Sequence, residues 1–161
     1  MTINQKVFIM EPGKGSSYWF GVDLLTFKAV GEDTQQQYVL LEAIIQPASG
    51  VPPHTHSRED ESFYIQEGTF EFYLDEQKTI ATPGTFLYSP KGQLHSFINI
   101  GSEPGKLLIW VTPAGFEKFM AEVAIPAENQ IIPAQPLNAS DLQRIIQTAK
   151  KYGMEIIPPS S

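Results

Sequence analysis

The sequence predicts an all-β fold, a sandwich or barrel of short strands with helices packed on it at the C-terminal end. Three observations support this prediction. From about residue 6 to about residue 113, the chain consists of short segments rich in Val, Ile, Tyr, Phe and Thr, which favour strands. Gly, Pro, Asp and Asn separate these segments at short intervals, as turns require. After Pro113 the hydrophobic residues recur at helical spacing.

The strand pattern divides the first part of the chain into separate elements. "FYIQEGTFEFYL" predicts a hairpin with Gly68 at its turn, because glycine takes positive φ at low cost. Pro52 and Pro53 predict extended backbone up to the histidines that follow them. The strands, including the two of this hairpin, are expected at residues 6–10, 18–29, 37–45, 62–66, 69–74, 79–82, 85–89, 95–99 and 106–112.

Two helices are expected after the strands, joined by a Pro-rich link over residues 125–136. Residues 114–124 carry Phe116, Phe119, Met120 and Val123 at helical spacing. In the second helix, over residues 138–153, the apolar stripe is Leu142, Ile145, Ile146 and Ala149. Asn138 or Ser140 can cap this helix, Asp141 suits its positive end, and Gly153 is placed to end it. We expect it to act as a structural brace.

The bulk composition limits the classes of function. The 161 residues suit one domain, with a barrel over about 6–113 and a helical extension over about 114–161. A net charge of -7 disfavours nucleic acid as a partner. The sequence contains no cysteine, which excludes disulfides and thiolate ligands. It shows no secretory or membrane-spanning apolar run, so we expect a cytoplasmic protein without a membrane partner.

The chemistry of the sequence centres on its three histidines. His54 and His56 stand two residues apart on an extended segment, and side chains at i and i+2 point to the same side of a strand. His95 opens a later strand, and antiparallel pairing would bring it to the other two. The three histidines therefore predict a shared site.

Acidic residues at 59–61 add a carboxylate to this site, and the residues alone leave open whether Glu59, Asp60 or Glu61 provides it. Three imidazoles and one carboxylate suit one divalent transition metal, Fe, Mn, Ni, Co, Cu or Zn. Four protein ligands on an octahedral ion leave two positions open, which is typical of catalytic metal sites.

Two motifs of this sequence resemble those of the cupin superfamily. In the first, written G-x5-H-x-H-x3,4-E-x6-G, the fixed positions fall on His54, His56, Glu61 and Gly68. In the second, written G-x5-P-x-G-x2-H-x3-N, they fall on Gly84, Pro90, Gly92, His95 and Asn99. One position departs from the pattern, since Ala48 stands where the first motif begins with glycine. That glycine shapes a turn, so its absence leaves the ligands unaffected.

The resemblance implies a jelly-roll barrel that holds a metal through His54, His56, Glu61 and His95. The C-terminal pattern also resembles a group of single-domain cupins of the quercetin 2,3-dioxygenase type. It implies a metal-dependent dioxygenase acting on a small enolisable aromatic substrate, with Glu61 as both ligand and general base. The alternatives are a metal-dependent sugar isomerase, epimerase or lyase, and a non-enzymatic cupin that binds a small ligand.

Further expectations concern the surroundings of the site and the partners of the chain. An aromatic substrate needs a pocket with apolar walls. Gln93, two residues before His95, is a polar residue that either reaches the site or is exposed in the turn. Tyr64 and Tyr73 have the opposite strand parity to their aromatic neighbours, so some of these rings are expected to face outward or toward a partner subunit. We expect a homodimer in which the strand at 6–10 pairs with a second subunit. The aromatic candidates for the walls are Phe63, Phe97, Trp110, Phe116 and Phe119.

Overall fold

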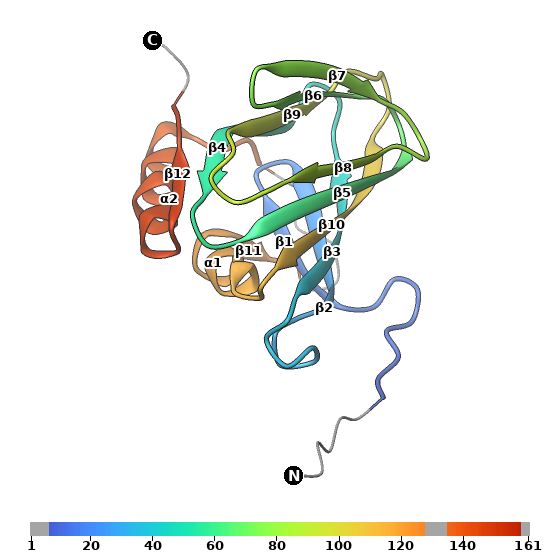
Figure 1. The fold of residues 1–161 in the computed structure, drawn as a ribbon, viewed down its shortest axis with the longest axis vertical. Helices are drawn as coiled ribbons and strands as arrows, with labels where there is room; N and C mark the ends of the chain where they lie inside the picture. Colours follow the sequence, from blue (N-terminus) through green and yellow to red (C-terminus); the bar gives the residue numbers. More distant parts are fainter. Residues whose placement is uncertain (1–6, 128–134, 159–161) are drawn as a thin grey trace.

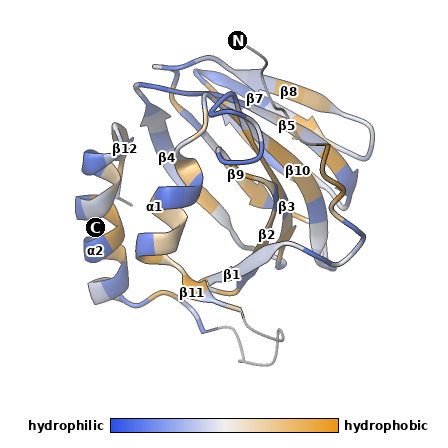
Figure 2. Ribbon diagram, turned by 90° about the horizontal axis from the view of Figure 1, so that it is seen from below, coloured by the Kyte–Doolittle hydropathy of each residue, from blue (hydrophilic) through white to orange (hydrophobic). Residues whose placement is uncertain are grey.

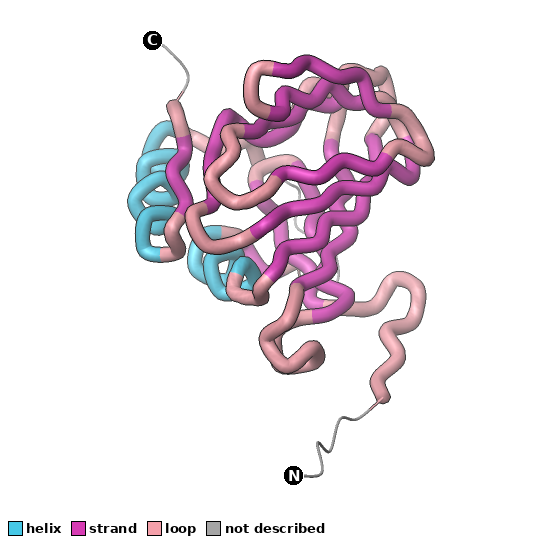
Figure 3. The backbone as a smooth tube through the Cα atoms, viewed as in Figure 1, coloured by secondary structure: helices cyan, strands magenta, loops and turns pink. Residues whose placement is uncertain are grey.

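Two antiparallel β-sheets face one another in the computed structural model, which describes residues 7–127 and 135–158 of the chain (Figure 1). Two helices lie together on one side of this double sheet (Figure 3). The predicted all-β jelly-roll fold with helices packed on it is therefore confirmed.

The larger sheet has seven strands among the described residues, in the order β11-β1-β2-β3-β10-β5-β8. The smaller sheet has five, in the order β12-β4-β9-β6-β7. The strands of the larger sheet are β1 (Ser16–Phe20), β2 (Asp23–Ala29), β3 (Val39–Ile45), β5 (Asp60–Glu67), β8 (Phe86–Ser89), β10 (Gly105–Thr112) and β11 (Ile125–Pro126). Those of the smaller sheet are β4 (Gly50–His56), β6 (Phe70–Leu74), β7 (Gln77–Ala81), β9 (His95–Asn99) and β12 (Met154–Ile156).

The core lies between the inner faces of the two sheets. Along β3 and β10, buried residues alternate with partly exposed ones, which is the period-2 pattern of a strand with one buried face. From the smaller sheet, the rings of Phe72 and Phe97 meet with centroids 5.1 Å apart. Figure 2 shows hydrophobic residues along the central strands of this interior. Burial of these aromatic and branched side chains is the main stabilising contribution to the fold.

Two of the expected strands are wrong. Residues 7–10 form no strand, and Val7 and Ile9 are almost fully exposed, because no strand among residues 7–127 and 135–158 pairs with them. The expected strand at 18–29 is a hairpin of β1 and β2, with Phe20 paired to Asp23. Gly21 takes a φ of +61° in the two-residue turn, which is the conformation that such a turn favours.

Two short strands at the C-terminal end were not expected. β11 pairs with β1 and covers the first residues of the Pro-rich link. β12 pairs with β4, so that Met154 lies opposite His56 and Ile156 lies opposite His54. The C-terminal segment therefore completes the smaller sheet beside the strand that carries two of the histidines.

Both predicted helices are present, as α1 (Phe116–Val123) and α2 (Ala139–Lys151). Asn138 caps α2 in a capping box with Asp141, and Gly153 follows the helix with a φ of +74°. The buried residues of the two helices, Phe119, Met120, Val123, Ile145 and Ala149, join the core. Within the described ranges, no helix has the length and apolar composition to cross a membrane.

Candidate metal centre

Three strands from both sheets supply the side chains of the site. β4 carries His54 and His56, and its neighbour β9 carries His95 opposite His54. β5 of the larger sheet carries Glu61, which pairs with Ser89 of β8. Glu61 therefore reaches the histidines across the interior, and the site joins the two sheets.

The loops that cross between the sheets fix the strands relative to one another. The Gly92 N–H donates to the His56 carbonyl at 2.7 Å, and the Lys91 N–H donates to Asp60 Oδ1 at 2.9 Å. These bonds tie the β8–β9 loop to the β4–β5 loop, so the two motif segments form one unit. Gly92 has a φ of +85°, which glycine adopts without strain.

Glu61 Oε2 is the point on which the three imidazole rings converge. It lies 2.7 Å from His95 Nε2, 3.2 Å from His56 Nε2 and 3.8 Å from His54 Nε2. One potential ligand atom from each of the four residues lies within 4.8 Å of the others. His56, His95 and Glu61 are buried. The structure thus brings together all four residues that the sequence predicted as metal ligands.

The other nitrogen of each ring faces a polar partner. His54 Nδ1 lies 2.9 Å from the Pro52 carbonyl. His95 Nδ1 lies 3.0 Å from Ser89 Oγ and 3.1 Å from the Gln93 carbonyl. A proton on Nδ1 can be donated to each of these carbonyl oxygens, which leaves the Nε2 lone pair directed at the centre.

The pKa values of the cluster follow from burial and charge. Burial lowers the pKa of His54. Burial also acts to lower the pKa of His56, but the Glu61 and Glu59 carboxylates outweigh it and raise that pKa to about 9. Burial acts to raise the pKa of Glu61, but the charge of His56 and the nearby imidazole nitrogens of all three histidines hold it well below its usual range. The shifts of His56 and Glu61 share one cause, the attraction between an imidazolium and a carboxylate in a buried site.

The donor set fits a divalent transition metal. Both ring nitrogens of His56 are buried and have no hydrogen-bond partner among the residues that the structure describes. An unsatisfied buried nitrogen is costly, and a cation at the centre would accept the lone pair of Nε2. Neutral imidazoles with one carboxylate suit Fe, Mn, Ni, Co, Cu or Zn.

Glu59 and Gln93 differ from the four converging residues. Glu59 is buried, but its Oε2 lies 3.4 Å from His56 Nδ1, on the far side of the ring from Glu61. Of the acidic residues at 59–61, Glu61 is therefore the one whose carboxylate meets the three Nε2 atoms. The Gln93 side chain is exposed, and this residue contacts His95 through its carbonyl.

An apolar cavity of about 330 Å³ leads to His54 and Glu61. Phe97, Phe116 and Phe119 line it, as expected for three of the five aromatic candidates. Phe63 instead belongs to the core, with its ring centroid 5.9 Å from that of His95. Trp110 alternates with the buried residues of β10, so its strand parity directs it to the opposite face. Tyr64 and Tyr73 are both about two-fifths exposed at their strand positions, which confirms that they face outward.

Sequence reasoning missed several residues around the cavity. The β1–β2 hairpin contributes Phe20 and Asp23 to the wall, although it was expected to be one strand. Ser89, the partner of His95 Nδ1, carries a signal in the sequence, since it directly precedes Pro90 of the second motif. The pairing of Asp23 with Ser49 has no such signal, because 26 residues separate the two.

Comparisons with known proteins agree with this geometry. Residues 41–112 match the family described as Cupin domain. Over 152 residues, the chain is 26% identical to the quercetin 2,3-dioxygenase of Bacillus subtilis (strain 168), a match that covers 94% of this chain and 44% of that protein. The chain spans about half the length of the curated relatives it matches.

Solved structures share the fold. A predicted oxalate decarboxylase from Thermotoga maritima superposes with a TM-score of 0.62 at 17% identity, over 66% of this chain and 99% of that chain. KdgF from Halomonas sp. gives a TM-score of 0.61 at 16% identity, over 70% and 98%. With the double sheet and the four converging side chains, the family match identifies residues 41–112 of the chain as a cupin domain.

Proposed function

We propose that this chain is a metal-dependent oxygenase of the quercetinase type, acting on a small enolisable aromatic substrate. The observation that carries the proposal is the apolar cavity of about 330 Å³ that ends at Glu61 and His54. Ligand pockets start at about this volume and combine apolar walls with a few polar groups that orient the ligand. An aromatic molecule in the cavity would present an oxygen to the metal centre.

A divalent metal held by His54, His56, Glu61 and His95 would supply Lewis acidity at the end of the cavity. The side chains of the chain itself have separate tasks. The Glu61 carboxylate lines the cavity and can accept the hydroxyl proton of an enolisable substrate placed at the metal centre. Phe97 and Phe116 line the cavity with apolar surface and exclude water from the reacting end.

The similarity to the Bacillus subtilis quercetin 2,3-dioxygenase supports this reaction class, because it extends over 94% of the chain. It includes the C-terminal residues as well as the barrel. The chain covers 44% of that protein, so a shared activity is part of the proposal.

The walls of the cavity favour an aromatic substrate over a sugar. A sugar carries hydroxyl groups around its whole ring, and each buried hydroxyl needs a hydrogen-bond partner. Most residues that line this cavity are apolar, among them Leu25, Met120 and Ile145. The sugar isomerase alternative is therefore less compatible with the site than an oxygenase.

The test is oxygen consumption by the metal-loaded protein with a flavonol. We expect oxygen uptake with at least one of Fe, Mn, Ni, Co, Cu and Zn. Glu61→Gln should abolish uptake, whereas Glu67→Gln, an exposed residue on the same strand, should leave it unchanged. Absence of oxygen uptake with every metal and a broad panel of enolisable aromatics would contradict the proposal and favour an isomerase, a lyase or a binding protein.

A further inference from the structure

A buried carboxylate lies in the wall of the cavity away from the metal centre. Asp23 opens β2 and is 5% exposed. Its Oδ1 accepts from the Gln46 N–H at 2.9 Å, and its Oδ2 accepts from the Ser49 hydroxyl at 2.6 Å. Burial raises the pKa of Asp23, against the effect of these two hydrogen bonds. The chemistry proposed at Glu61 makes no use of this group.

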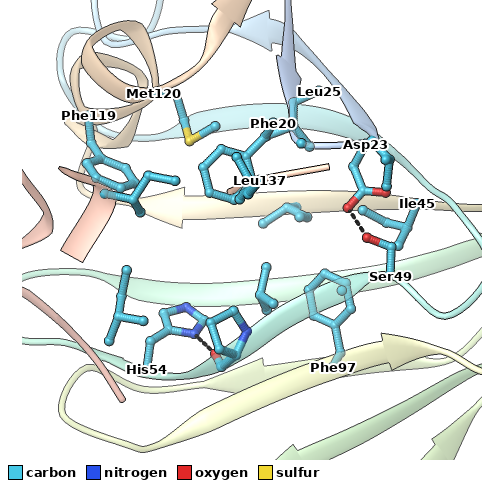
Figure 4. A pocket seen from close by; sticks show the side chains of 18 of the residues that line it. Phe20, Asp23, Leu25, Ile45, Ser49, His54, Phe97, Phe119, Met120 and Leu137 are labelled. Carbon is cyan, nitrogen blue, oxygen red and sulfur yellow. Dashed lines mark hydrogen bonds between the residues drawn. The ribbon is translucent and has the colours of Figure 1, made fainter. Parts of the chain in front are cut away.

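Asp23 and the metal centre lie at opposite ends of the cavity. Figure 4 shows His54 at one end and the hydrogen-bonded side chains of Asp23 and Ser49 at the other. Ser49 precedes β4 and His54 lies five residues further along the chain, which corresponds to at most roughly 16 Å, because a register shift between Val51 and His54 shortens the strand. Phe97 and Leu25 line the space between them. The cavity is therefore elongated, with a polar group at each end and apolar walls between.

The Asp23 carboxylate retains acceptor capacity for a ligand. Its two oxygens offer about four acceptor positions, and the donors from Gln46 and Ser49 occupy two of them. In apolar surroundings, a hydrogen bond to a carboxylate is strong and directional. A site built to receive a hydroxyl discriminates strongly against the analogue that lacks it.

We propose that the Asp23–Ser49 pair is the distal recognition point of the cavity and selects elongated apolar substrates with a hydroxyl at the end away from Glu61. This inference rests on the proposed function, since it assumes that the substrate oxygen is placed at the metal centre. The substrate class is then a flat, multi-ring aromatic with a metal-binding oxygen at one end and a phenolic hydroxyl at the other.

The structural role of Asp23 must be separated from recognition. Asp23 holds the turn from Gln46 to Ser49, so its loss can disturb the cavity as a whole. Such a disturbance would weaken every ligand alike, whereas loss of recognition affects the hydroxylated ligand alone. Asp33 is a matched control, because its carboxylate also accepts a backbone N–H in a turn, from Val30 at 3.0 Å, and it is exposed.

The experiment compares two probes by calorimetry under nitrogen, with the metal-loaded protein. One probe is the parent flavonol, and the other is the flavonol with one added phenolic hydroxyl on its far ring. We expect the wild type to bind the hydroxylated probe roughly 10- to 100-fold more tightly, as hydrogen bonds to a charged group do. Asp23→Asn should reduce this ratio to a few-fold and change the affinity for the parent flavonol far less. Asp33→Asn should keep the full ratio.

Equal binding of both probes by the wild type would overturn the inference, as would an equal loss for both probes in Asp23→Asn. Oxygen uptake is measured separately on the same preparations. Discrimination without oxygen uptake supports distal recognition and rejects the oxygenase. Oxygen uptake without discrimination leaves the oxygenase standing and rejects distal recognition. Binding of neither probe rejects this substrate class.

Discussion

At the scale of single residues, the candidate metal centre depends on His54 and His95, whose paired positions on β4 and β9 bring the two rings to 4.2 Å between centroids. We expect the purified protein to bind about one divalent metal per chain. His54→Ala combined with His95→Ala should abolish binding, because two of the four donor atoms are lost. Elemental analysis measures this. Full metal content in the double variant would contradict the site.

Glu59 is expected to position His56 without contacting the metal. Its carboxylate lies 3.4 Å from His56 Nδ1 and would hold the ring with Nε2 toward Glu61. Glu59→Ala should lower metal affinity by about 10- to 100-fold. Glu59→Gln, which keeps a side-chain oxygen near Nδ1, should recover part of it.

A competition titration with a chelator gives these affinities, and circular dichroism tests the fold of each variant. Glu103→Gln, at an exposed position, is the control. Unchanged affinity in Glu59→Ala would show that Glu59 has no positioning role.

Ala48 replaces the glycine of the first motif and takes a φ of +61°. A side chain in this left-handed conformation destabilises the folded state by about 1–2 kcal/mol, and glycine avoids this strain. Glycine in turn makes the unfolded chain more flexible, which lowers the stability of the folded state by about 0.4–1 kcal/mol. Ala48→Gly should therefore raise the free energy of unfolding by up to about 1.6 kcal/mol. Urea denaturation measures the change, and a loss of stability would contradict this account of the turn.

At the scale of elements, β12 supports the strand that carries His54 and His56. Gly153, the residue directly before β12, packs closely against the end of β4: a Cβ at this position would lie 2.5 Å from Ser57 Oγ. Gly153 also has a φ of +74°, which side-chain-bearing residues rarely adopt. Gly153→Ala should lower the free energy of unfolding by about 1–2 kcal/mol or more and weaken metal binding.

Gly13→Ala is the matched control for this element. Gly13 has a φ of +70°, and a Cβ there would meet nothing within 4 Å. Gly13→Ala should lower the free energy of unfolding through the positive φ alone, without a steric clash, and should leave metal binding unchanged. Equal losses of stability in the two variants, with equal metal affinity, would show that β12 does not support the site.

At the scale of the whole molecule, the expected homodimer stays a prediction. Val7 and Ile9 are 93% and 85% exposed, and β8 is the edge strand of the larger sheet with Phe86 and Tyr88 exposed. An extended apolar segment can pair with such an edge in a second copy and bury both surfaces. We therefore expect residues 7–10 of each chain to pack on β8 of the other.

Sedimentation equilibrium tests the dimer. Ile9→Lys should shift the equilibrium toward monomer, because it would bury a charge in the contact. Ile100→Lys, at a position 48% exposed in a loop, should leave it unchanged. A wild type that is monomeric at all concentrations would contradict the expectation.

The sequence by itself predicted the strand-rich fold, the two helices and a shared site for the three histidines, and the resemblance to the cupin motifs singled out Glu61 among the acidic residues. Strand parity directs His54 and His56 to one side, and this local rule needs no knowledge of distant contacts. The capping box at Asn138 and the turn at Gly68 are equally local, since neighbouring residues form them. Such features depend on interactions between residues that are close in the sequence, so they can be predicted from the order of the residues.

Only the tertiary structure shows which segments that are distant in the sequence lie next to one another. β12 pairs with β4 across almost a hundred residues, and the Asp23–Ser49 pair forms between separate strands. The same applies to Trp110, whose face of β10 depends on strand register. It also applies to residues 7–10, which pair with no strand in the part of the chain that the structure describes. Long-range pairing depends on shape and register summed over the whole core, so no local pattern specifies it. The sequence thus predicts the ligands of a metal, and the tertiary structure places a cavity with a second polar end beside them.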